Sequence, residues 1–479
     1  MSPILSAVLL LSGCTGPSTI PSGTSGTLEP PQPPVSATGD VDLIQAVARV
    51  DDDQGTVLWI SWEQSGAATV HLEFSSEPGV WRSSPERGLG AGPHSDLVLG
   101  VPYDTDVTWR IVAISAGGTT TTPEVITRTA EIPHDLPWPW VVTSDPSGWD
   151  PQVDYVLVSV SYDDAFYGGH MTSVLDRQGR VVWARPSRRG FATLHPRVAW
   201  GETSFLLDHS GFWGDGLGNG DRSVVEEVRI DGSVVTEHAT PGLYHPYTDL
   251  PDGSIAYPRH WTQDLDGEPG PDGEKVIVLR PDGSELELFD CTGWLGDRCG
   301  ANTLSYDPAR DALLYSLFTV ETVLELDATT GVPRRWFGHI DGSWPFSPLE
   351  SAFWYQHGSV YTDTGTLLIS THRDEDSTEL VVREYEVDEA SQSLVQIWSF
   401  GEGQGEVGRQ MGEAHRLPDG NTLHNLGTHA VLREITPEGR VVWDVRWENT
   451  EYGDPAGGHS IGRSAPIAVD LYAFVPELP

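Results

Sequence analysis

The sequence predicts an all-β fold in which a small β-sandwich precedes a six-bladed β-propeller. Two observations lead to this prediction. The 479 residues include 52 Gly, 36 Pro and 18 Trp but few long stretches of helical apolar periodicity, a balance typical of turn-rich β structure. In addition, one short phrase recurs six times after residue 150, at intervals of about 50 residues.

The recurring phrase defines the large domain, residues 151–479. It consists of apolar residues, a turn with Asp or Gly, and a strand that often ends in Trp. The copies begin at Leu175, Ile230, Leu279, Leu326, Val387 and Thr436. Each copy is expected to form the outer hairpin of one four-stranded blade. The apolar run 465–472 is expected to complete blade one as a closing strand, which would remove an exposed sheet edge.

The region before the repeats predicts a separate small domain. Residues 41–131 contain alternating apolar runs at 57–62, 69–74 and 107–113, separated by turn residues as in a seven-strand sandwich. The stretch 99–105 (Leu-Gly-Val-Pro-Tyr-Asp-Thr) resembles the E–F corner of fibronectin type III domains. This domain shows no chemical motif, which favours a spacer or packing module. Residues 132–150, rich in Pro and Trp, are expected to form a connector that packs against the propeller.

The N-terminal segment predicts export and a lipid anchor. Residues 1–14 form an apolar run too short to span a bilayer, as in a signal peptide. The run ends in Leu-Ser-Gly-Cys, which resembles a lipobox in which Cys14 would be acylated. Residues 15–40 cannot bury a core and are expected to form a disordered linker. The expected location is the cell envelope, in the periplasm or at the outer membrane or cell surface, with membrane contact through the lipid alone.

Charge and cysteine content indicate which partners, disulfides and cofactors to expect. The formal net charge of −42 argues against nucleic acid as a partner, because phosphate contacts need clustered cations. Cys291 and Cys299 lie close together in the sequence, and in an exported protein a disulfide between them is expected. No cofactor is predicted. The Asp- and Gly-rich segments 215–221 and 264–268 leave Ca²⁺ as an alternative, although neither continues as an EF-hand.

Three histidines share one register of the repeat. His195, His245 and His357 each lie nine positions before the residue that opens the next strand of the blade. The first strand of each propeller blade lines the central channel, so these side chains are expected to converge there. Asn302 lies at or near the equivalent position of blade four, and Gly412 lies at that of blade six. Converging imidazoles suit anion binding, nucleophilic catalysis, or Zn or Fe coordination, although no local metal motif accompanies them. An inert channel lined by structural polar residues is a further alternative.

Phrases in the last two blades resemble a known family. Gln356-His357, the strand 367–373 (Leu-Leu-Ile-Ser-Thr-His-Arg) and the segment 416–423 (Arg-Leu-Pro-Asp-Gly-Asn-Thr-Leu) resemble the bacterial arylsulfate sulfotransferases. The resemblance extends over roughly residues 150–475. It implies transfer of a sulfuryl group from an aryl sulfate to a phenol through a sulfohistidine, without a nucleotide donor. The alternative is a non-catalytic propeller lipoprotein that binds a ligand or a protein.

The resemblance also assigns residues to roles in the transfer. It matches His357 to the family's blade-five histidine, His245 to the oxyanion-binding histidine and Arg373 to the sulfate-binding arginine. Arg383 is a fallback for Arg373 and is otherwise expected to be a solvated strand residue.

The family's nucleophile is the point of departure, because its position falls on Gly412. His415 is the first candidate to replace it. Simple strand alternation would face His415 away from the Gly412 side, so this role requires a local turn. The fallback candidates are His429, His424 and His195. Complete loss of the nucleophile would lower the rate by orders of magnitude, which is why the non-catalytic alternative is kept.

Overall fold

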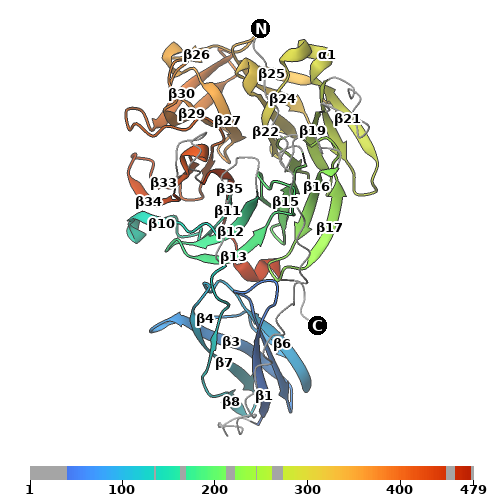
Figure 1. Cartoon of the computed structure of the whole chain (residues 1–479), viewed down its shortest axis with the longest axis vertical. Helices are drawn as coiled ribbons and strands as arrows, with labels where there is room; N and C mark the ends of the chain where they lie inside the picture. Colours follow the sequence, from blue (N-terminus) through green and yellow to red (C-terminus); the bar gives the residue numbers. More distant parts are fainter. Residues whose placement is uncertain are drawn as a thin grey trace, which may run out of the picture.

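The computed structural model describes residues 40–133, 136–161, 169–211, 222–243, 245–260, 273–448 and 459–475. In these ranges the chain forms a sandwich, at the bottom of Figure 1, and a ring of six sheets above it. The predicted fold class is therefore confirmed. Cys14 and both candidate calcium segments lie outside the described residues. No helix within those residues is long and apolar enough to cross a membrane.

The N-terminal sandwich consists of two antiparallel sheets. One contains β1 (Leu43–Val50), β2 (Leu58–Gln64) and β6 (Gly92–Val98). The other contains β4 (Val80–Ser83), β3 (Ala68–Glu77), β7 (Asp106–Ser115) and β8 (Gly118–Thr121), with β5 (Arg87–Leu89) on β3 and β9 (Val125–Arg128) on β7. Alternation explains the core, because Leu72, Phe74, Trp109 and Ile111 point inward and are buried.

The propeller consists of six blades around one channel, each built on four antiparallel strands. From the channel outward, blade one contains β35 (Ile461–Ile467), β11 (Tyr155–Ser161), β12 (His170–Asp176) and β13 (Val181–Pro186). Blade two contains β14 (Arg197–Val198), β15 (Phe205–His209), β16 (Val224–Val228) and β17 (Val234–Ala239). Blade three contains β18 (Thr248–Asp249), β19 (Ile255–His260), β20 (Glu274–Leu279) and β21 (Glu285–Asp290).

The other three blades follow the same plan, and two of them carry a fifth strand. Blade four contains β22 (Ala301–Asp307), β23 (Ala312–Leu317), β24 (Thr322–Asp327) and β25 (Pro333–Gly338). Blade five contains β27 (Trp354–Tyr361), β28 (Leu367–His372), β29 (Leu380–Asp388), β30 (Ser393–Phe400) and β26 (Phe346–Ser347). Blade six contains β31 (Glu413–Arg416), β32 (Thr422–Asn425), β33 (Val431–Ile435), β34 (Val441–Arg446) and β10 (Trp140–Ser144).

The ring is closed by its last strand in sequence. β35 pairs antiparallel with β11, with Leu157 opposite Ala465, and so becomes the inner strand of blade one. Figure 1 places β35 beside β11 in the middle of the ring. The predicted closing strand is therefore confirmed, although it begins at Ile461, earlier than the run at 465–472. The connector contributes β10, which pairs with β34 at the outer edge of blade six.

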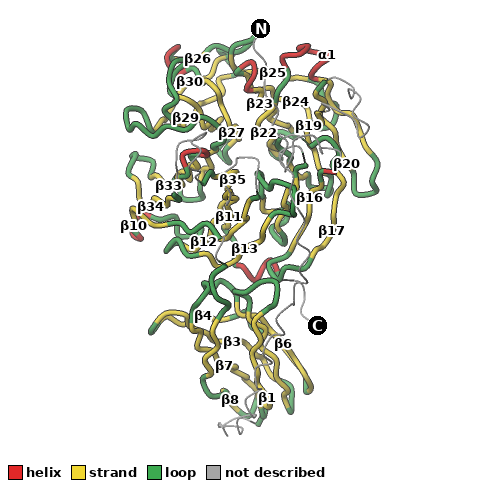
Figure 2. Tube along the Cα trace, in the orientation of Figure 1, coloured by secondary structure: helices red, strands yellow, loops and turns green. Residues whose placement is uncertain are grey.

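The helices are short, as the red segments of Figure 2 show, and lie between strands except for the last one, which follows β35. The α-helix among the described residues is α1 (Cys291–Leu295). The 3₁₀ turns are η1 (Pro146–Gly148), η3 (Gly296–Arg298), η4 (Phe318–Val320), η5 (Leu349–Ser351), η6 (Gly427–His429) and η7 (Leu471–Phe474).

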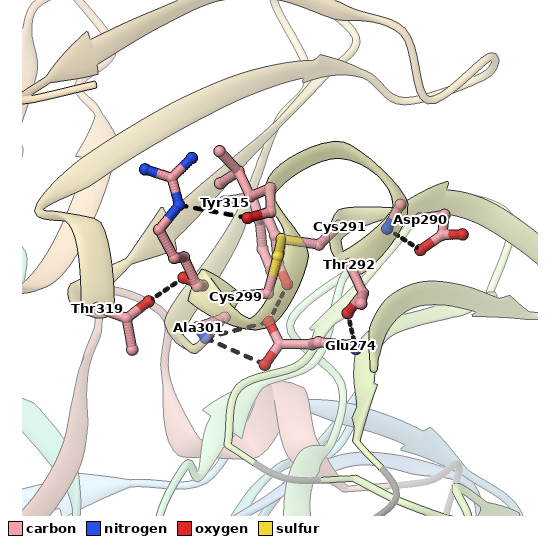
Figure 3. Close-up of a disulfide and its surroundings, with 11 residues drawn as sticks. Glu274, Asp290, Cys291, Thr292, Cys299, Ala301, Tyr315 and Thr319 are labelled. Atoms are coloured by element: carbon pink, nitrogen blue, oxygen red, sulfur yellow. Dashed lines mark hydrogen bonds between the residues drawn. A yellow bond between two sulfur atoms is a disulfide. The ribbon is translucent and has the colours of Figure 1, made fainter. Parts of the chain in front are cut away.

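The predicted disulfide links the two ends of the α1 segment. Cys291 and Cys299 are bonded, with Cα atoms 6.0 Å apart, so that prediction is confirmed. Beneath the disulfide, Glu274 accepts hydrogen bonds from the Ala301 amide, 3.1 Å from Oε1, and from the Tyr315 hydroxyl (Figure 3). These bonds fix the start of β22, the inner strand of blade four.

The sandwich packs firmly on the propeller. A single apolar cluster contains Leu97 and Leu99 of the sandwich together with Trp183, Phe205 and Phe474 of the propeller. Such a shared core favours a fixed arrangement over a flexible one. This contact is consistent with the expectation of a packing module.

Part of the motif that carries the family resemblance has a structural role. The Asn421 side chain donates to Glu434 Oε1 at 2.6 Å and to the Gly148 carbonyl at 2.8 Å. Glu434 also accepts from the Asp150 amide at 2.7 Å, and it is fully buried. The Gly-Asn-Thr-Leu phrase thus fastens the connector to blade six and does not by itself indicate catalysis.

Candidate active site in the propeller channel

The predicted convergence of the three register histidines occurs at the start of the inner strands. His195 and His245 lie just before β14 and β18, and their rings are perpendicular with centroids 6.0 Å apart. His357 lies on β27, and its Nδ1 donates to the Tyr355 carbonyl at 2.8 Å. His195 and His357 are both close enough to His245 to lower its pKa by charge repulsion. The shared register in the sequence therefore correctly predicted that these three histidines lie together in the channel.

These histidines are held neutral. Burial lowers the pKa of His357 to about 3 and lowers the pKa of His245 well below its usual value. Burial also lowers the pKa of His195, and Asp208 opposes that shift. An imidazole that is neutral at physiological pH has a free ring lone pair, which is needed for nucleophilic attack.

His195 has the strongest orienting partner. Asp208, fully buried on β15, accepts the Leu194 amide at 3.0 Å and the His195 amide at 2.7 Å. Its Oδ2 lies 3.6 Å from His195 Nδ1, just beyond hydrogen-bond distance. His195 is only 4 % exposed, and neither ring nitrogen has a hydrogen-bond partner among the described residues. The carboxylate favours a proton on Nδ1, which leaves the lone pair on Nε2.

Arg463 is a buried cation of the channel, and the sequence analysis missed it. It lies on β35, is 4 % exposed, and donates from Nη2 to the Asn302 carbonyl at 2.7 Å and to Thr303 Oγ1 at 2.9 Å. Its Nη1 donates to the Gly412 carbonyl. The guanidinium thus reaches from blade one to blades four and six. The signal that could have revealed it was the closing strand, which puts residue 463 near the register position of blade one.

A cavity of about 140 Å³ lies on the channel beside His195 and Arg463. Residues at the inner edge of all six blades line it, including His195, Tyr247, Thr303, Val360, His415 and Ser464. The cavity therefore belongs to the channel and not to the space between two blades.

His415 reaches this cavity, as a candidate site residue should. Its Nε2 lies 2.9 Å from the Ser464 carbonyl and 3.5 Å from Glu413 Oε2. His415 and Glu413 alternate with the buried Ala414 along β31, so His415 faces the channel side without a local turn. The structure thus brings His415 and His195 to one cavity.

Gly412 cannot simply be exchanged for the family's histidine. Its φ is +108°, a region that side chains disfavour, and an added Cβ would lie 3.1 Å from Ser370 Oγ. Its carbonyl is already held by Arg463. A side chain at this position would therefore be strained.

The arginines assigned by resemblance lie elsewhere. Arg373 follows β28, with its side chain 44 % exposed, and binds Glu379 at 2.7 Å and Asp374 at 2.8 Å. Among the described residues its side-chain partners are these two carboxylates and no channel histidine, because the side chain extends beyond the strand end toward its acidic neighbours. Arg383 is not a solvated residue, and that expectation is wrong. It is 4 % exposed and donates to the Arg373 carbonyl at 2.7 Å and to the Ala352 carbonyl.

The two remaining fallback histidines are committed to other contacts. His424 is buried on β32, and its Nε2 lies 3.0 Å from Ser370 Oγ of blade five. His429 on η6 is paired with Glu406. Neither lines the cavity beside His195.

A second set of histidines was also missed. His209, His260 and His372 end the second strands of blades two, three and five, one step outward from the channel. His209 Nε2 lies 3.2 Å from Glu226, and His372 Nε2 lies 3.0 Å from the Gly408 carbonyl. Their shared position at the end of the second strand of a blade is the sequence signal that could have revealed them. The contacts of His209 and His372 are those of residues that support the inner ring.

The described residues do not bring together the side chains that a metal site needs. Within the residues that the structure describes, no three His, Cys, Asp or Glu side chains are grouped closely enough to hold an ion. The Zn or Fe alternative therefore has no donor set there.

Comparisons with known proteins give the fold alone. No family model and no curated protein matches the chain. Among solved structures, a Bacteroides caccae protein of unknown function matches with a TM-score of 0.42 and 16 % identity, over 66 % of this chain and 99 % of that one. A streptogramin B lyase matches with a TM-score of 0.38 and 11 % identity, over 68 % of this chain and 98 % of that one. Likenesses this distant carry no argument about activity.

Proposed function

We propose that this protein transfers a sulfuryl group from an aryl sulfate to a phenol, without a nucleotide, and that His195 is its nucleophile. The observation that best supports the proposal is the environment of His195. Its buried, neutral ring lies between a fixed carboxylate and His245, close enough to Arg463 for that positive charge to affect its pKa. This is the arrangement expected of an activated imidazole.

The first half of the transfer is as follows. His195 Nε2 attacks the sulfur of the aryl sulfate. An N–S bond forms as the S–O bond to the ring breaks, and the phenolate leaves with the electron pair and takes a proton from water. Arg463 and the neighbouring imidazoles favour the negative sulfate oxygens, and Asp208 stabilises the positive charge that develops on His195.

His195 suits this role better than His415. His195 lies beside His245 and near Arg463, the groups that suit an oxyanion. His415 instead lies 3.5 Å from Glu413, whose negative charge also acts on His195 but is opposed there by Arg463. We therefore prefer His195 to His415 as the nucleophile.

The test uses p-nitrophenyl sulfate as donor and phenol as acceptor, with no nucleotide. The parent protein should release p-nitrophenol, and His195→Ala should lower the rate by a factor of about 10³ or more. His94→Ala, in the sandwich, is the matched control and should leave the rate unchanged. Intact-protein mass spectrometry of the parent without acceptor should show the addition of one SO₃ group. No release with any of several phenols would refute the proposal.

The second candidate function is ligand binding without turnover. It is favoured by Gly412 at the family's nucleophile position, with Arg463 hydrogen-bonded across the channel. Calorimetry would then detect binding of p-nitrophenyl sulfate while the donor remains intact after long incubation.

We further propose that the protein is exported and held at the cell envelope through a lipid on Cys14. The Cys291–Cys299 disulfide supports an oxidising compartment. Cys14→Ser should move the protein from the membrane fraction to the soluble fraction of the envelope. Unchanged membrane association of that variant would contradict the anchor.

A further inference from the structure

We propose that a second hollow of the molecule, where the sandwich meets the propeller, binds a neutral saccharide the size of a disaccharide. We call it the junction pocket; Val80, Trp149, Asp154, Arg177 and Gln178 are among the residues that line it. Figure 1 shows β4 of the sandwich just below β12 and β13 of blade one, where the pocket lies. It shares no lining residue with the channel cavity, so the proposal is independent of sulfuryl transfer.

The size of the junction pocket suits two linked six-membered rings. Its volume is about 370 Å³, whereas a cavity of about 150 Å³ in another protein holds benzene, which is a single six-membered ring. Val80, Pro146 and Asp154 line the pocket and are exposed, so it opens to solvent on their side. A ligand from outside the protein therefore has access to it.

Contacts between the sandwich and the propeller hold the walls of the junction pocket in place. Arg82 of the sandwich donates from Nη1 to the Tyr155 hydroxyl at 3.0 Å and from Nη2 to the Gly100 carbonyl at 2.8 Å. Arg180 of the propeller is paired with Glu77 of the sandwich, with Nη2 2.6 Å from Oε1. Walls that are fixed before binding lower the entropy cost of taking up a ligand.

The charges of the lining are nearly balanced, which favours a neutral ligand. The lining contains three arginines and four carboxylates, namely Arg82, Arg177, Arg180, Glu77, Asp150, Asp154 and Asp176. Arg180 Nε lies 2.7 Å from Asp176 Oδ2, so these two charges offset each other within the wall. An ion of either sign would meet like charges in the pocket. A hydroxyl suits both kinds of group, because it accepts from a guanidinium and donates to a carboxylate.

Arg177 supplies donors that the protein itself does not use. It lines the junction pocket, is 6 % exposed, and donates from Nη2 to Glu434. Its Nε and Nη1 have no hydrogen-bond partner among the residues that the structure describes. Buried donors of this kind are costly unless an oxygen of a ligand or of water accepts from them. The hydroxyls and ring oxygen of a sugar are acceptors of the required kind.

Trp149 supplies apolar surface for a sugar ring. Its indole N–H donates to the Val442 carbonyl at 3.2 Å, so the indole contributes ring carbon to the lining. Val80, Val153 and the ring of Tyr155 add to this surface. A pyranose has an apolar C–H face and a rim of hydroxyls. Aromatic and aliphatic walls beside paired charges match both parts of such a ligand.

The experiment is saturation-transfer NMR on the full chain, with maltose, cellobiose, lactose and trehalose as probes. At least one of them should show saturation transfer. Val80→Trp fills the pocket from a position on β4 that is 53 % exposed, and it should weaken binding of that sugar about tenfold or more. Asp154→Ala removes an exposed acceptor and should weaken binding less. Val332→Trp, on the turn between β24 and β25 where Val332 is 59 % exposed, is the matched control and should bind as the parent does.

Three results would overturn the proposal. The first is no saturation transfer from any of the disaccharides to the parent protein. The second is binding that stays at the parent level in folded Val80→Trp and Asp154→Ala, which would place the sugar elsewhere. The third is preferential binding of an ion, measured as displacement of the bound sugar by glycylglycine or sulfate at equal concentration. Release of p-nitrophenol should be the same in Val80→Trp and the parent, so failure of sulfuryl transfer leaves this test unaffected.

Discussion

Blades two and six have equivalent places in the ring but present different chemistry to the channel. Blade two presents His195, backed by the Asp208 carboxylate. Blade six presents Gly412, whose backbone excludes a side chain and whose carbonyl is held by Arg463. A propeller gives each blade the same access to its axis. Whether the channel could support catalysis is therefore better judged from all the side chains that meet at the axis than from the single position 412.

The largest effect is expected from Asp208→Asn in blade two. The amide keeps the shape but removes the charge that faces His195 Nδ1, so transfer should slow about 10- to 100-fold, as for other residues that orient an imidazole. Without that carboxylate the pKa of His195 falls further, and the acid limb of the pH–rate profile should move to lower pH.

Asp252→Asn is the control for this variant, because Asp252 is exposed and caps the Ser254 amide at 2.9 Å in a turn of blade three. Its rate and pH profile should equal those of the parent. A parent-like pH profile for Asp208→Asn would mean that Asp208 does no more than hold the backbone.

A smaller effect is expected from Gly412→His, which places the family's residue in blade six. The positive φ and the 3.1 Å approach to Ser370 Oγ should destabilise the fold by about 1–3 kcal/mol, measured by urea unfolding. The variant should not restore transfer to a His195→Ala background. Gly403→Ala is the control that separates the cost of the positive φ from the cost of the close contact. Gly403 also has a positive φ, but an added Cβ there would have nothing within 4 Å. Recovery of transfer in the double variant would show that blade six can still hold the nucleophile.

The smallest effect is expected from His424→Gln in blade six. Burial lowers the pKa of His424 to about 3, whereas an unfolded histidine titrates near 6.5. Between these values the unfolded state binds the extra proton, so His424 makes the protein less stable as pH falls from 6.5 toward 3.

The variant should therefore flatten the stability–pH curve in that window, by at most about 1.4 kcal/mol per pH unit. Urea unfolding at several pH values measures it, with His94→Gln as the control. A slope equal to that of the parent would show that Ser370 tolerates a charged imidazole.

The fold was predictable from sequence because each blade repeats the same local pattern. His195, His245 and His357 could be placed by register for the same reason. Arg463 could not, because its role depends on ring closure and on contacts with Asn302 and Gly412, far away in sequence. Asp208 was visible in a repeated strand, but its carboxylate acts on a neighbouring strand, and no periodicity reveals that contact.

The family resemblance predicted the positions of site residues less reliably than the blade repeat did. It directed attention to His415, which does line the cavity. It also directed attention to Arg373, whose guanidinium lies with Glu379 and Asp374 beyond the end of β28. A motif fixes the strand on which a residue lies, but the direction of a side chain at a strand end depends on its local charges.

The closing strand has a consequence for biosynthesis. β35 pairs with β11, which lies about 300 residues earlier in the chain, and contacts this distant in sequence form late in folding. The same strand brings Arg463 to its partners in blades four and six. A growing chain therefore cannot assemble the site until residues 461–467 have left the ribosome. The channel imidazoles remain without this guanidinium until the ring is complete.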